Sequence, residues 1–398
     1  MRRLLTRAFC LVLALTLLLP TFVLAQDEMP SMGSDMLEAC PTPANLPETV
    51  SIGALFTLSG GASVYGVVQQ QAVQLAVDEI NAAGYLGEGV TLQVLFEDSA
   101  SENEQAINAM TKLVEEDQVV AVIGPTLSRE AFSADPIAQE NGTVVIGVSN
   151  TAAGITDMGE FVFRNSLPES DVIPGTVAQA TAILGLEKVG ILYGNDDDFT
   201  VSGYEVFKSA LEENGVEILG EETFAVGDVD FNAQLTNLIA NEPDALVVSA
   251  LAAEAVQIII QARALGFEGP IIGGNGFNSP AVLDQSGADS EGLIVGAAWN
   301  IASPNEYSVA FSAAFEEAFS NKPDQFAAQA YSGAWLVATA IRCADSVDRT
   351  AVRDALAGIT EFNSPLGVFS FDENRNPVHD PVVQIARDGA FAVLTSEE

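Results

Sequence analysis

Residues 119–151 constrain the fold more than any other stretch, because they contain two short apolar runs separated by a helical pattern. The runs at 119–123 and 143–146 lack the polar alternation of a half-exposed strand, which is typical of parallel strands covered on both faces. A Gly-Pro turn ends the first run, and a Ser-Asn-Thr turn follows the second at 149–151. Both turns are therefore predicted at one edge of a parallel sheet, where open α/β sheets hold ligands.

Hydroxyl groups are present after both runs. Ser128 is predicted to begin the intervening helix, where its side chain either caps the helix or contacts a ligand. For Thr151, in the second turn, helix capping is again the alternative to ligand binding. Free backbone N–H groups at a helix start, together with hydroxyl groups, form a receptor for an anion such as a carboxylate.

Strand and helix patterns alternate along most of the chain, which predicts an α/β fold with doubly wound parallel sheets. Two similar halves meet near residues 166–170. Helices predicted at 308–319 and 325–344 follow without an intervening strand, and the tail predicts strands at 368–371 and 382–394. The other predicted strands are at 50–56, 92–97, 160–166, 189–193, 216–224, 245–249, 270–273 and 292–298, and the other helices are at 66–83, 102–116, 202–214, 231–240 and 252–265.

The chain is strongly acidic: its 398 residues contain 55 Asp and Glu against 15 Lys and Arg, a formal net charge of −40. Phosphate contacts need clustered Lys and Arg, so no nucleic-acid partner is expected and anionic membrane surfaces are disfavoured. The acidic surface is either an adaptation to high salt, where self-repulsion is screened, or that of an acidic secreted protein.

Residues 1–25 predict an export signal, because three Arg precede an apolar run at 9–19 and a small-residue cleavage site ends at Ala25. A membrane anchor is the alternative, but the run is short and a proline follows it. The next residue is Gln26 rather than Cys, so no lipid anchor is expected. Residues 26–47 are polar, rich in proline and without periodicity, and are predicted to form a flexible leader.

Three cysteines are present, and Cys10 would leave with the export signal. Cys40 and Cys343 remain in a compartment that permits disulfides, so they form either one bridge or two unpaired thiols. A bridge between them would close a very long loop, which the chain-entropy model values at roughly 5 kcal/mol.

The sequence lacks the patterns of a cofactor or metal site. No phosphate-binding GxxxxGK(S/T) is present, and the Gly-rich stretches at 58–62 and 273–276 lack the GxGxxG spacing. His379 is the only histidine, which excludes a multi-His metal site and argues against a Ser-His-Asp triad. The acidic stretch at 196–198 lacks EF-hand spacing and is interpreted as a solvated turn. We therefore expect no cofactor, no metal and no enzymatic activity.

Seven segments occur in an order that carries a family resemblance: ALFTLSGGASVYG (54–66), QAVQLAVDEINAAGYLG (71–87), VIGPTLSREA (122–131), VVIGVSNTAAGIT (144–156), FVFRNSLPESD (161–171), QARALGF (261–267) and FAAQAYSGAWLVATAI (326–341). The chain from about 48 to 395 thereby resembles the leucine/isoleucine/valine-binding protein family, the type I periplasmic substrate-binding proteins of ABC transporters. Each motif alone is weak, but their order behind an export signal is fairly specific.

The resemblance implies two Rossmann-like doubly wound lobes joined by a three-segment hinge, with a ligand enclosed between them. The first lobe is expected to contain residues 48–168 and 300–366. The second is expected to contain residues 169–299 and 367–398.

The family's motifs, matched position by position, imply a cradle for a ligand carboxylate. The serine after the VIG turn matches Ser128, which would receive the carboxylate. The pair in the next turn matches Ser149 and Thr151, which would complete the cradle. The aromatic residue before the first helix matches Tyr65, which implies one wall of the pocket.

The resemblance also implies an acid that meets the ligand ammonium. This acid falls on Glu169, where the family more often has Asp, and Asp171 is the alternative if the alignment slips. In the second lobe, Phe199 falls near an aromatic wall position, Asn275 falls where some members have an acid, and Leu251 replaces an aromatic residue.

The resulting expectation is an extracytoplasmic solute-binding protein that captures an amino acid, branched-chain first, for an ABC importer by hinge closure. It implies a permease partner in the membrane, a monomer, and export as a soluble protein to the periplasm or cell exterior. The alternatives are a receptor for an amide, urea or aromatic acid on the same fold, or a stand-alone ligand sensor. A hydrolase would need a nucleophile with a base, which the single histidine disfavours.

Overall fold

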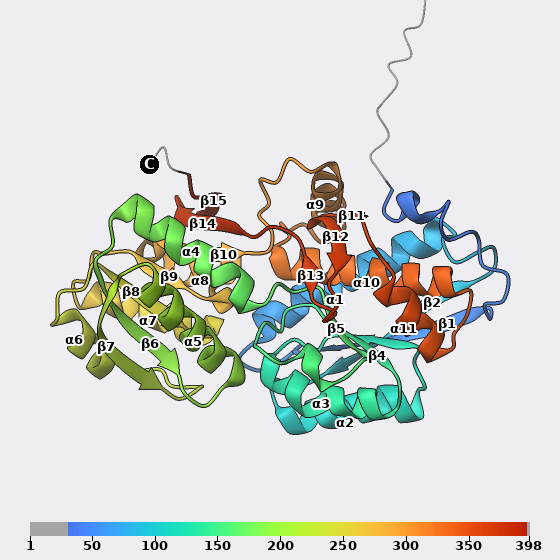
Figure 1. Ribbon diagram of the computed structural model, residues 1–398, viewed down its shortest axis with the longest axis horizontal. Coiled ribbons are helices and arrows are strands. Elements are labelled where there is room, and N and C mark those ends of the chain that lie inside the picture. The colour runs from blue at the N-terminus through green and yellow to red at the C-terminus, as the bar shows by residue number, and fades with distance from the viewer. Residues whose placement is uncertain (1–30, 396–398) are drawn as a thin grey trace, which may run out of the picture.

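The computed structural model describes residues 31–395, which form two α/β lobes lying side by side (Figure 1). The export signal expected at 1–25 and the first residues of the expected leader lie outside the described residues. Within the described range, no helix combines the length and the apolar character needed to cross a membrane.

Lobe 1 is built on a parallel sheet with helices on both faces. In sheet order its strands are β2 (Thr91–Asp98), β1 (Thr49–Phe56), β3 (Ala121–Ile123), β4 (Val144–Gly147) and β5 (Val162–Arg164). Its helices are α1 (Ser63–Ala82), α2 (Asn103–Thr111) with the π-helical turn η2 (Lys112–Glu116), α3 (Ser128–Glu140), the 3-10 turn η3 (Thr156–Met158), α9 (Glu306–Phe319), α10 (Gln325–Ala344) and α11 (Arg349–Ala357). On β1, Ile52 and Phe56 pack with α1 and α10, whereas Leu55 packs with α2 and α3. This two-sided burial explains why the central strands read as continuous apolar runs.

Lobe 2 has a larger mixed sheet. In sheet order its strands are β15 (Ala390–Val393), β14 (Val382–Arg387), β10 (Leu293–Ala297), β9 (Ile271–Gly273), β8 (Ala245–Ser249), β6 (Lys188–Gly194) and β7 (Glu217–Phe224), with β14 antiparallel to both of its neighbours. Its helices are α4 (Glu169–Leu184), α5 (Asp198–Glu213), α6 (Asn232–Ile239), α7 (Ala252–Ala264), the 3-10 turn η4 (Asn275–Phe277), α8 (Pro280–Ser286) and the 3-10 turn η5 (Gly287–Ser290). Val247 packs with α4 and α5, and Val248 packs with α6, α7 and α8.

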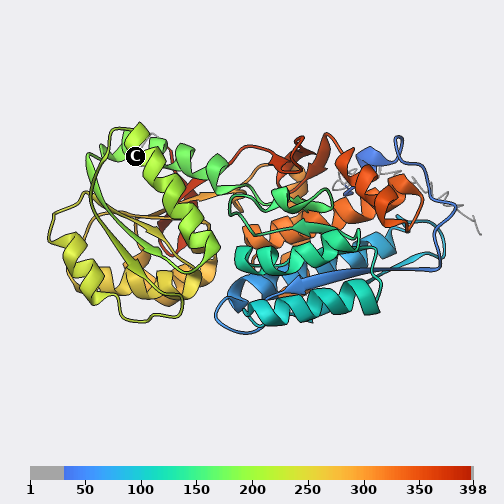
Figure 2. The same cartoon turned by 60° about the horizontal axis from the view of Figure 1, so that its bottom comes forward.

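The chain passes between the lobes three times, at 165–168, 298–305 and 379–381 (Figures 1 and 2). The expectation of two doubly wound lobes joined by a three-segment hinge is therefore confirmed.

One expected boundary is wrong. A small antiparallel sheet of β11 (Phe362–Ser364), β12 (Gly367–Phe371) and β13 (Pro377–Val378) stays with lobe 1 instead of crossing at 367. Phe369 is fully buried in the lobe 1 core, and the ring of Phe371 lies 5.3 Å from that of Phe163. Apolar burial against β5 therefore holds this segment, and the return to lobe 2 comes only after β13.

Helix α4 was not predicted from the sequence, and it contains Pro174 and Gly175, which are the two poorest helix formers. The structure places both inside the helix. Proline has no N–H, so the helix loses the hydrogen bond to the carbonyl of Ser170, four residues earlier. Ser170 is exposed. Water can therefore satisfy that carbonyl, so the helix tolerates the proline.

Residues 31–47 are attached to lobe 1, so the expectation of a flexible leader is wrong for them. They include a short 3-10 turn, η1 (Ser34–Met36). The N–H groups of Ala44 and Asn45 both donate to the carboxylate of Asp345, at 2.8 Å. Buried Met32 joins the lobe 1 core.

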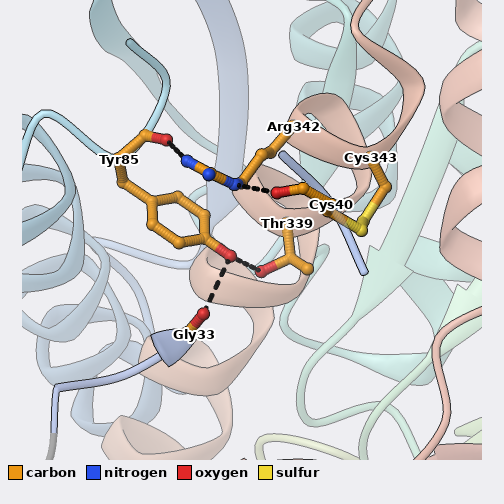
Figure 3. Close-up of a disulfide and its surroundings, with 6 residues drawn as sticks. All are labelled: Gly33, Cys40, Tyr85, Thr339, Arg342 and Cys343. Atoms are coloured by element: carbon orange, nitrogen blue, oxygen red, sulfur yellow. Dashed lines mark hydrogen bonds between the residues drawn. A yellow bond between two sulfur atoms is a disulfide. The ribbon is translucent and has the colours of Figure 1, made fainter. Parts of the chain in front are cut away.

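Figure 3 shows the main attachment, a disulfide between Cys40 and Cys343 with the two Cα atoms 4.6 Å apart. The guanidinium of Arg342 donates from Nε to the carbonyl of Cys40 at 2.6 Å and from Nη1 to the carbonyl of Tyr85. The Tyr85 hydroxyl bonds to the Thr339 hydroxyl at 3.0 Å. The leader is therefore joined both covalently and by buried hydrogen bonds to the end of α10.

Candidate functional site

A pocket lies between the lobes, where the carboxyl ends of the lobe 1 strands face lobe 2. We call it the inter-lobe pocket. Five of the expected site residues line it: Tyr65, Ser128, Ser149, Phe199 and Asn275. Its lining is Tyr65, Thr126, Leu127, Ser128, Ser149, Asp197, Phe199, Leu251, Asn275, Gly276 and Phe326.

Ser128 ties the two turns of lobe 1 together instead of capping α3. Its Oγ accepts the backbone N–H groups of Thr151 and Ala152, at 3.2 and 3.3 Å, and it is the Glu130 carboxylate that caps α3, by accepting the N–H of Leu127 at 3.1 Å. A hydroxyl that accepts twice still has its own hydrogen to donate. Ser128 can therefore donate to an anion in the inter-lobe pocket.

Ser149 and Thr151 are both buried but differ in what they can offer. The Ser149 hydroxyl donates to the carbonyl of Thr126 at 2.6 Å and accepts from Gln69 Nε2 at 2.8 Å. Its hydrogen is already used, so it positions the turn. The Thr151 hydroxyl has no hydrogen-bond partner among the described residues, but Thr151 is not among the residues that line the pocket. Of the three expected cradle residues, Ser128 has the free donor at the pocket wall.

Glu169 lies in an adjoining hollow, the Glu169 pocket, lined by Leu167, Glu169, Val172, Ile173, Thr176, Gly273, Gly274, Asn275, Gly296, Ala298 and Gln329. Its side chain is 2% exposed, and neither carboxyl oxygen has a hydrogen-bond partner among the described residues. Burial raises the pKa of Glu169 to about 8, and the charge of Asp197 acts in the same direction. A contact with the Ser202 hydroxyl and the charge of Arg164 lower this pKa by less than burial raises it. The carboxyl forms no ion pair among the described residues.

Gly203 of α5 makes room for this carboxyl. A Cβ at position 203 would stand 2.7 Å from Glu169 Oε1 and 2.5 Å from Ser249 Oγ, which is closer than real Cβ contacts allow. The Ser249 hydroxyl is also buried and without a partner in the described chain. Two unpartnered polar groups therefore converge beside the Glu169 pocket.

The alternative acid, Asp171, is not part of the site. It is exposed and accepts a hydrogen bond from the neighbouring Ser170 hydroxyl at 3.1 Å. Two positions along a helix turn the side chain by about 200°, so a residue two after Glu169 faces away from the pocket.

Asn275 links the two pockets, because it lines both. Its Nδ2 donates across the lobes to the carbonyl of Ser149 at 3.4 Å. Its Oδ1 accepts from Gln325 Nε2 and, at 3.3 Å, from Asn278 Nδ2. A ligand that reaches from the Ser128 turn to Glu169 would pass this amide.

A family model for periplasmic binding proteins matches residues 49–390. The chain belongs to this family. It is accordingly a binding protein and not an enzyme.

Relatives of this periplasmic binding protein include the Leu/Ile/Val-binding protein BraC3 of Rhizobium johnstonii, 27% identical over 330 residues that cover 81% of this chain and 88% of the relative. The branched-chain amino acid transporter substrate-binding protein LivJ of Streptococcus pneumoniae, solved with isoleucine, is 31% identical, with a TM-score of 0.82 over 87% of this chain and 99% of that one. A solute-binding protein of R. palustris, solved with benzoate, is 23% identical with a TM-score of 0.80 over 87% and 95%. That last likeness shows the fold alone.

Asp197 is a site residue that sequence reasoning missed, because the acidic stretch at 196–198 was interpreted as a solvated turn. Its carboxylate is buried, accepts the N–H of Phe199 and of Thr200 at the start of α5, and pairs with Arg129 at 2.8 Å. An Asp just before a helical pattern is an N-cap signal that could have identified the first role. The pairing with Arg129 joins α3 of lobe 1 to lobe 2.

Tyr65 makes a second connection between the lobes of this binding protein. Its hydroxyl donates to the carbonyl of Gly276 and accepts the N–H of Ala252, both at 2.7 Å. Burial raises the pKa of Tyr65, so the hydroxyl keeps the proton that it donates. Its ring lies 4.7 Å from that of Phe326. Tyr65 thus lines the pocket and also connects the two lobes through its hydroxyl, a connection that we call the Tyr65 clasp. The lobes are closed on each other.

Replacing this hydroxyl tests the clasp directly. In Tyr65→Phe we expect hydrogen exchange at the Ala252 amide to accelerate by about tenfold or more, because that amide loses its partner. The matched control is Tyr204→Phe, whose hydroxyl bonds to Glu221 on the surface of lobe 2. Unchanged exchange at Ala252 would mean that the clasp does not form in solution.

Proposed function

We propose that this protein captures an amino acid outside the cytoplasmic membrane and presents it to the permease of an ABC importer. The observation that carries the proposal is a pair of groups in the two lobes: the Ser128 hydroxyl of lobe 1, which keeps its hydrogen to donate, and the buried Glu169 carboxyl of lobe 2, which forms no ion pair among the described residues. A zwitterion has a carboxylate for the first and an ammonium for the second. Both ends must meet partners, since burying an unpaired charge is costly.

A branched-chain amino acid fits best. The wall residues Tyr65, Phe199 and Leu251 are largely apolar, with Phe326 beside them, and none adds a charge for a ligand side chain. Arg129 is engaged with Asp197. The names of BraC3 and the isoleucine complex of LivJ support the same ligand class. Ligand binding would close the lobes about the three crossing segments.

The partners and location are part of the proposal. Residues 1–25 would direct export, and the mature protein would act as a soluble monomer in the periplasm or at the cell exterior. The closed form would then dock on a membrane permease. A stand-alone sensor is the alternative role on the same fold, and permease genes beside this gene would favour the importer.

A thermal-shift screen of the mature protein tests the ligand class. Leucine, isoleucine or valine at a hundred times Kd should raise the free energy of unfolding by about 2.7 kcal/mol. Stabilisation only by benzoate, simple amides or urea would mean that the ligand belongs to the alternative class and not to the amino acids, because such solutes have no ammonium for Glu169. No stabilisation by any of these, in folded protein stripped of carried-over ligand, would contradict the proposal.

The carboxylate cradle has its own test. Ser128→Ala with Thr151→Ala should weaken binding of the stabilising amino acid by roughly a hundredfold while the protein stays folded, since hydrogen bonds to a charged group are lost. The matched control is Thr111→Ala with Ser209→Ala, a pair of hydroxyls that bond locally on α2 and α5. Equal affinity in the two double variants would disprove the cradle.

A further inference from the structure

Lobe 1 contains another cavity, which shares no residue with the inter-lobe pocket or the Glu169 pocket. It opens between α1, α9 and α10, with Ser31 and Met32 of the N-terminal segment also on its wall, and has a volume of about 360 Å³. We call it the aromatic cavity. Its volume falls in the range of small-molecule sites.

Small residues keep this space open. Ala310 and Ala314 lie one turn apart on α9, and Ala82 and Ala83 lie at the end of α1, all on the cavity wall. Residues four apart share one face of a helix. Larger side chains on these faces would fill the space between the helices, so the alanines leave the cavity open.

Aromatic residues make up most of the remaining wall. Tyr307 and Phe311 come from α9, and Tyr331 and Trp335 come from α10, again four apart. The rings of Phe311 and Tyr331 lie 4.7 Å apart. The faces of aromatic rings carry partial negative charge and attract cations.

A carboxylate completes the cavity. Glu79 of α1 lines it and accepts a hydrogen bond from the Tyr331 hydroxyl. Burial raises the pKa of Glu79, while Tyr331 and Trp335 lower it. Among residues 31–395, no Lys, Arg or His forms an ion pair with Glu79. The partly buried carboxylate therefore has a hydroxyl partner but no counter-charge.

We propose that the aromatic cavity binds a small organic cation with a methylated ammonium group. Ring faces and one carboxylate together favour a cation over an anion or a neutral solute. A methylated ammonium also buries its methyl groups against the rings, and it has no N–H groups that would need further acceptors in a wall made mostly of aromatic, alanine and methionine side chains. This site is separate from amino-acid capture and does not rest on that proposal.

The probe is choline, compared with 3,3-dimethylbutan-1-ol, which has the same shape and no charge. Isothermal titration of the mature protein should show saturable binding of one choline, with the neutral analogue at least about tenfold weaker. Equal affinity for the two probes, or no saturable choline binding, would overturn the proposal.

Variants locate the bound choline. Glu79→Gln should weaken choline binding by at least about tenfold, whereas Glu169→Gln, which removes a buried carboxyl of lobe 2, should leave it unchanged. Ala314→Leu fills the cavity without touching Glu79 and should abolish binding, which keeps the test valid if Glu79→Gln fails to fold. Binding lost in Glu169→Gln and kept in Ala314→Leu would place choline in the inter-lobe cleft and refute the site.

Discussion

Glu169→Gln is expected to weaken amino-acid binding at pH 8 by at least about a hundredfold and, at the same pH, to raise the melting temperature of the ligand-free protein. The two effects have one cause. The Glu169 carboxyl is buried and forms no ion pair among the described residues, so its charge destabilises the ligand-free fold, and on the proposed function it would pair with the ligand ammonium. Removing one member of a buried charge pair costs about 3–5 kcal/mol.

The sign of the pH dependence follows from the raised pKa. Folding raises the pKa of Glu169 from 4.5 to about 8. Between these values the folded protein holds a proton that the unfolded chain has lost, so this group makes stability fall as pH rises from 4.5 to 8. Below pH 4.5 the ionisation of Glu169 does not affect the free energy of unfolding, and above pH 8 its destabilising effect has reached its full size. Glu169→Gln should therefore stabilise the ligand-free protein most above pH 8.

Binding should show the opposite trend. On the proposed function the ligand ammonium would need the ionised carboxylate, so below pH 8 binding should release a proton, and affinity should rise with pH by up to tenfold per pH unit. Calorimetry in two buffers of different ionisation enthalpy measures that proton. Burial also raises the pKa of Asp324, to about 7, so the Glu169→Gln variant is the necessary control. Equal proton release in wild type and variant would assign the titration to another group.

Loss of the disulfide should produce the largest change in stability. Cys40→Ser with Cys343→Ser removes a cross-link between residues 303 positions apart. The chain-entropy model predicts that losing such a cross-link lowers the free energy of unfolding by about 5 kcal/mol. Urea unfolding of the variant and the wild type measures this difference. Amino-acid affinity should stay the same, because neither cysteine lines the inter-lobe pocket or the Glu169 pocket.

Reduced wild-type protein is the matched control for this variant, since it keeps both side chains and lacks only the cross-link. It should lose the same free energy of unfolding. Two reactive thiols in the unfolded, unreduced protein, together with a loss below about 1 kcal/mol in the variant, would contradict the disulfide.

The amino-acid sequence by itself determined most of the strand and helix order and the edge at which the candidate site lies. The apolar runs at 119–123 and 143–146 correspond to β3 and β4, and the turns after them bring Ser128 and Ser149 to the pocket. These features are local, because periodicity and turn residues act within a few positions. Helix α4 was missed, and the structure shows that its Pro174 is tolerated because the carbonyl left without a backbone N–H belongs to the exposed Ser170.

Only the tertiary structure decided which polar groups are satisfied. Tyr65 bonds to Gly276, 211 residues away in the other lobe, and Asp197 pairs with Arg129 of lobe 1. The packing of Phe369 on lobe 1 and the attachment of residues 31–47 likewise depend on distant partners. Glu169 was selected by resemblance, but the absence of a partner among the described residues follows from what α5, β8 and β9 place around it. Burial and pairing are properties of groups that folding brings together, so no local pattern encodes them.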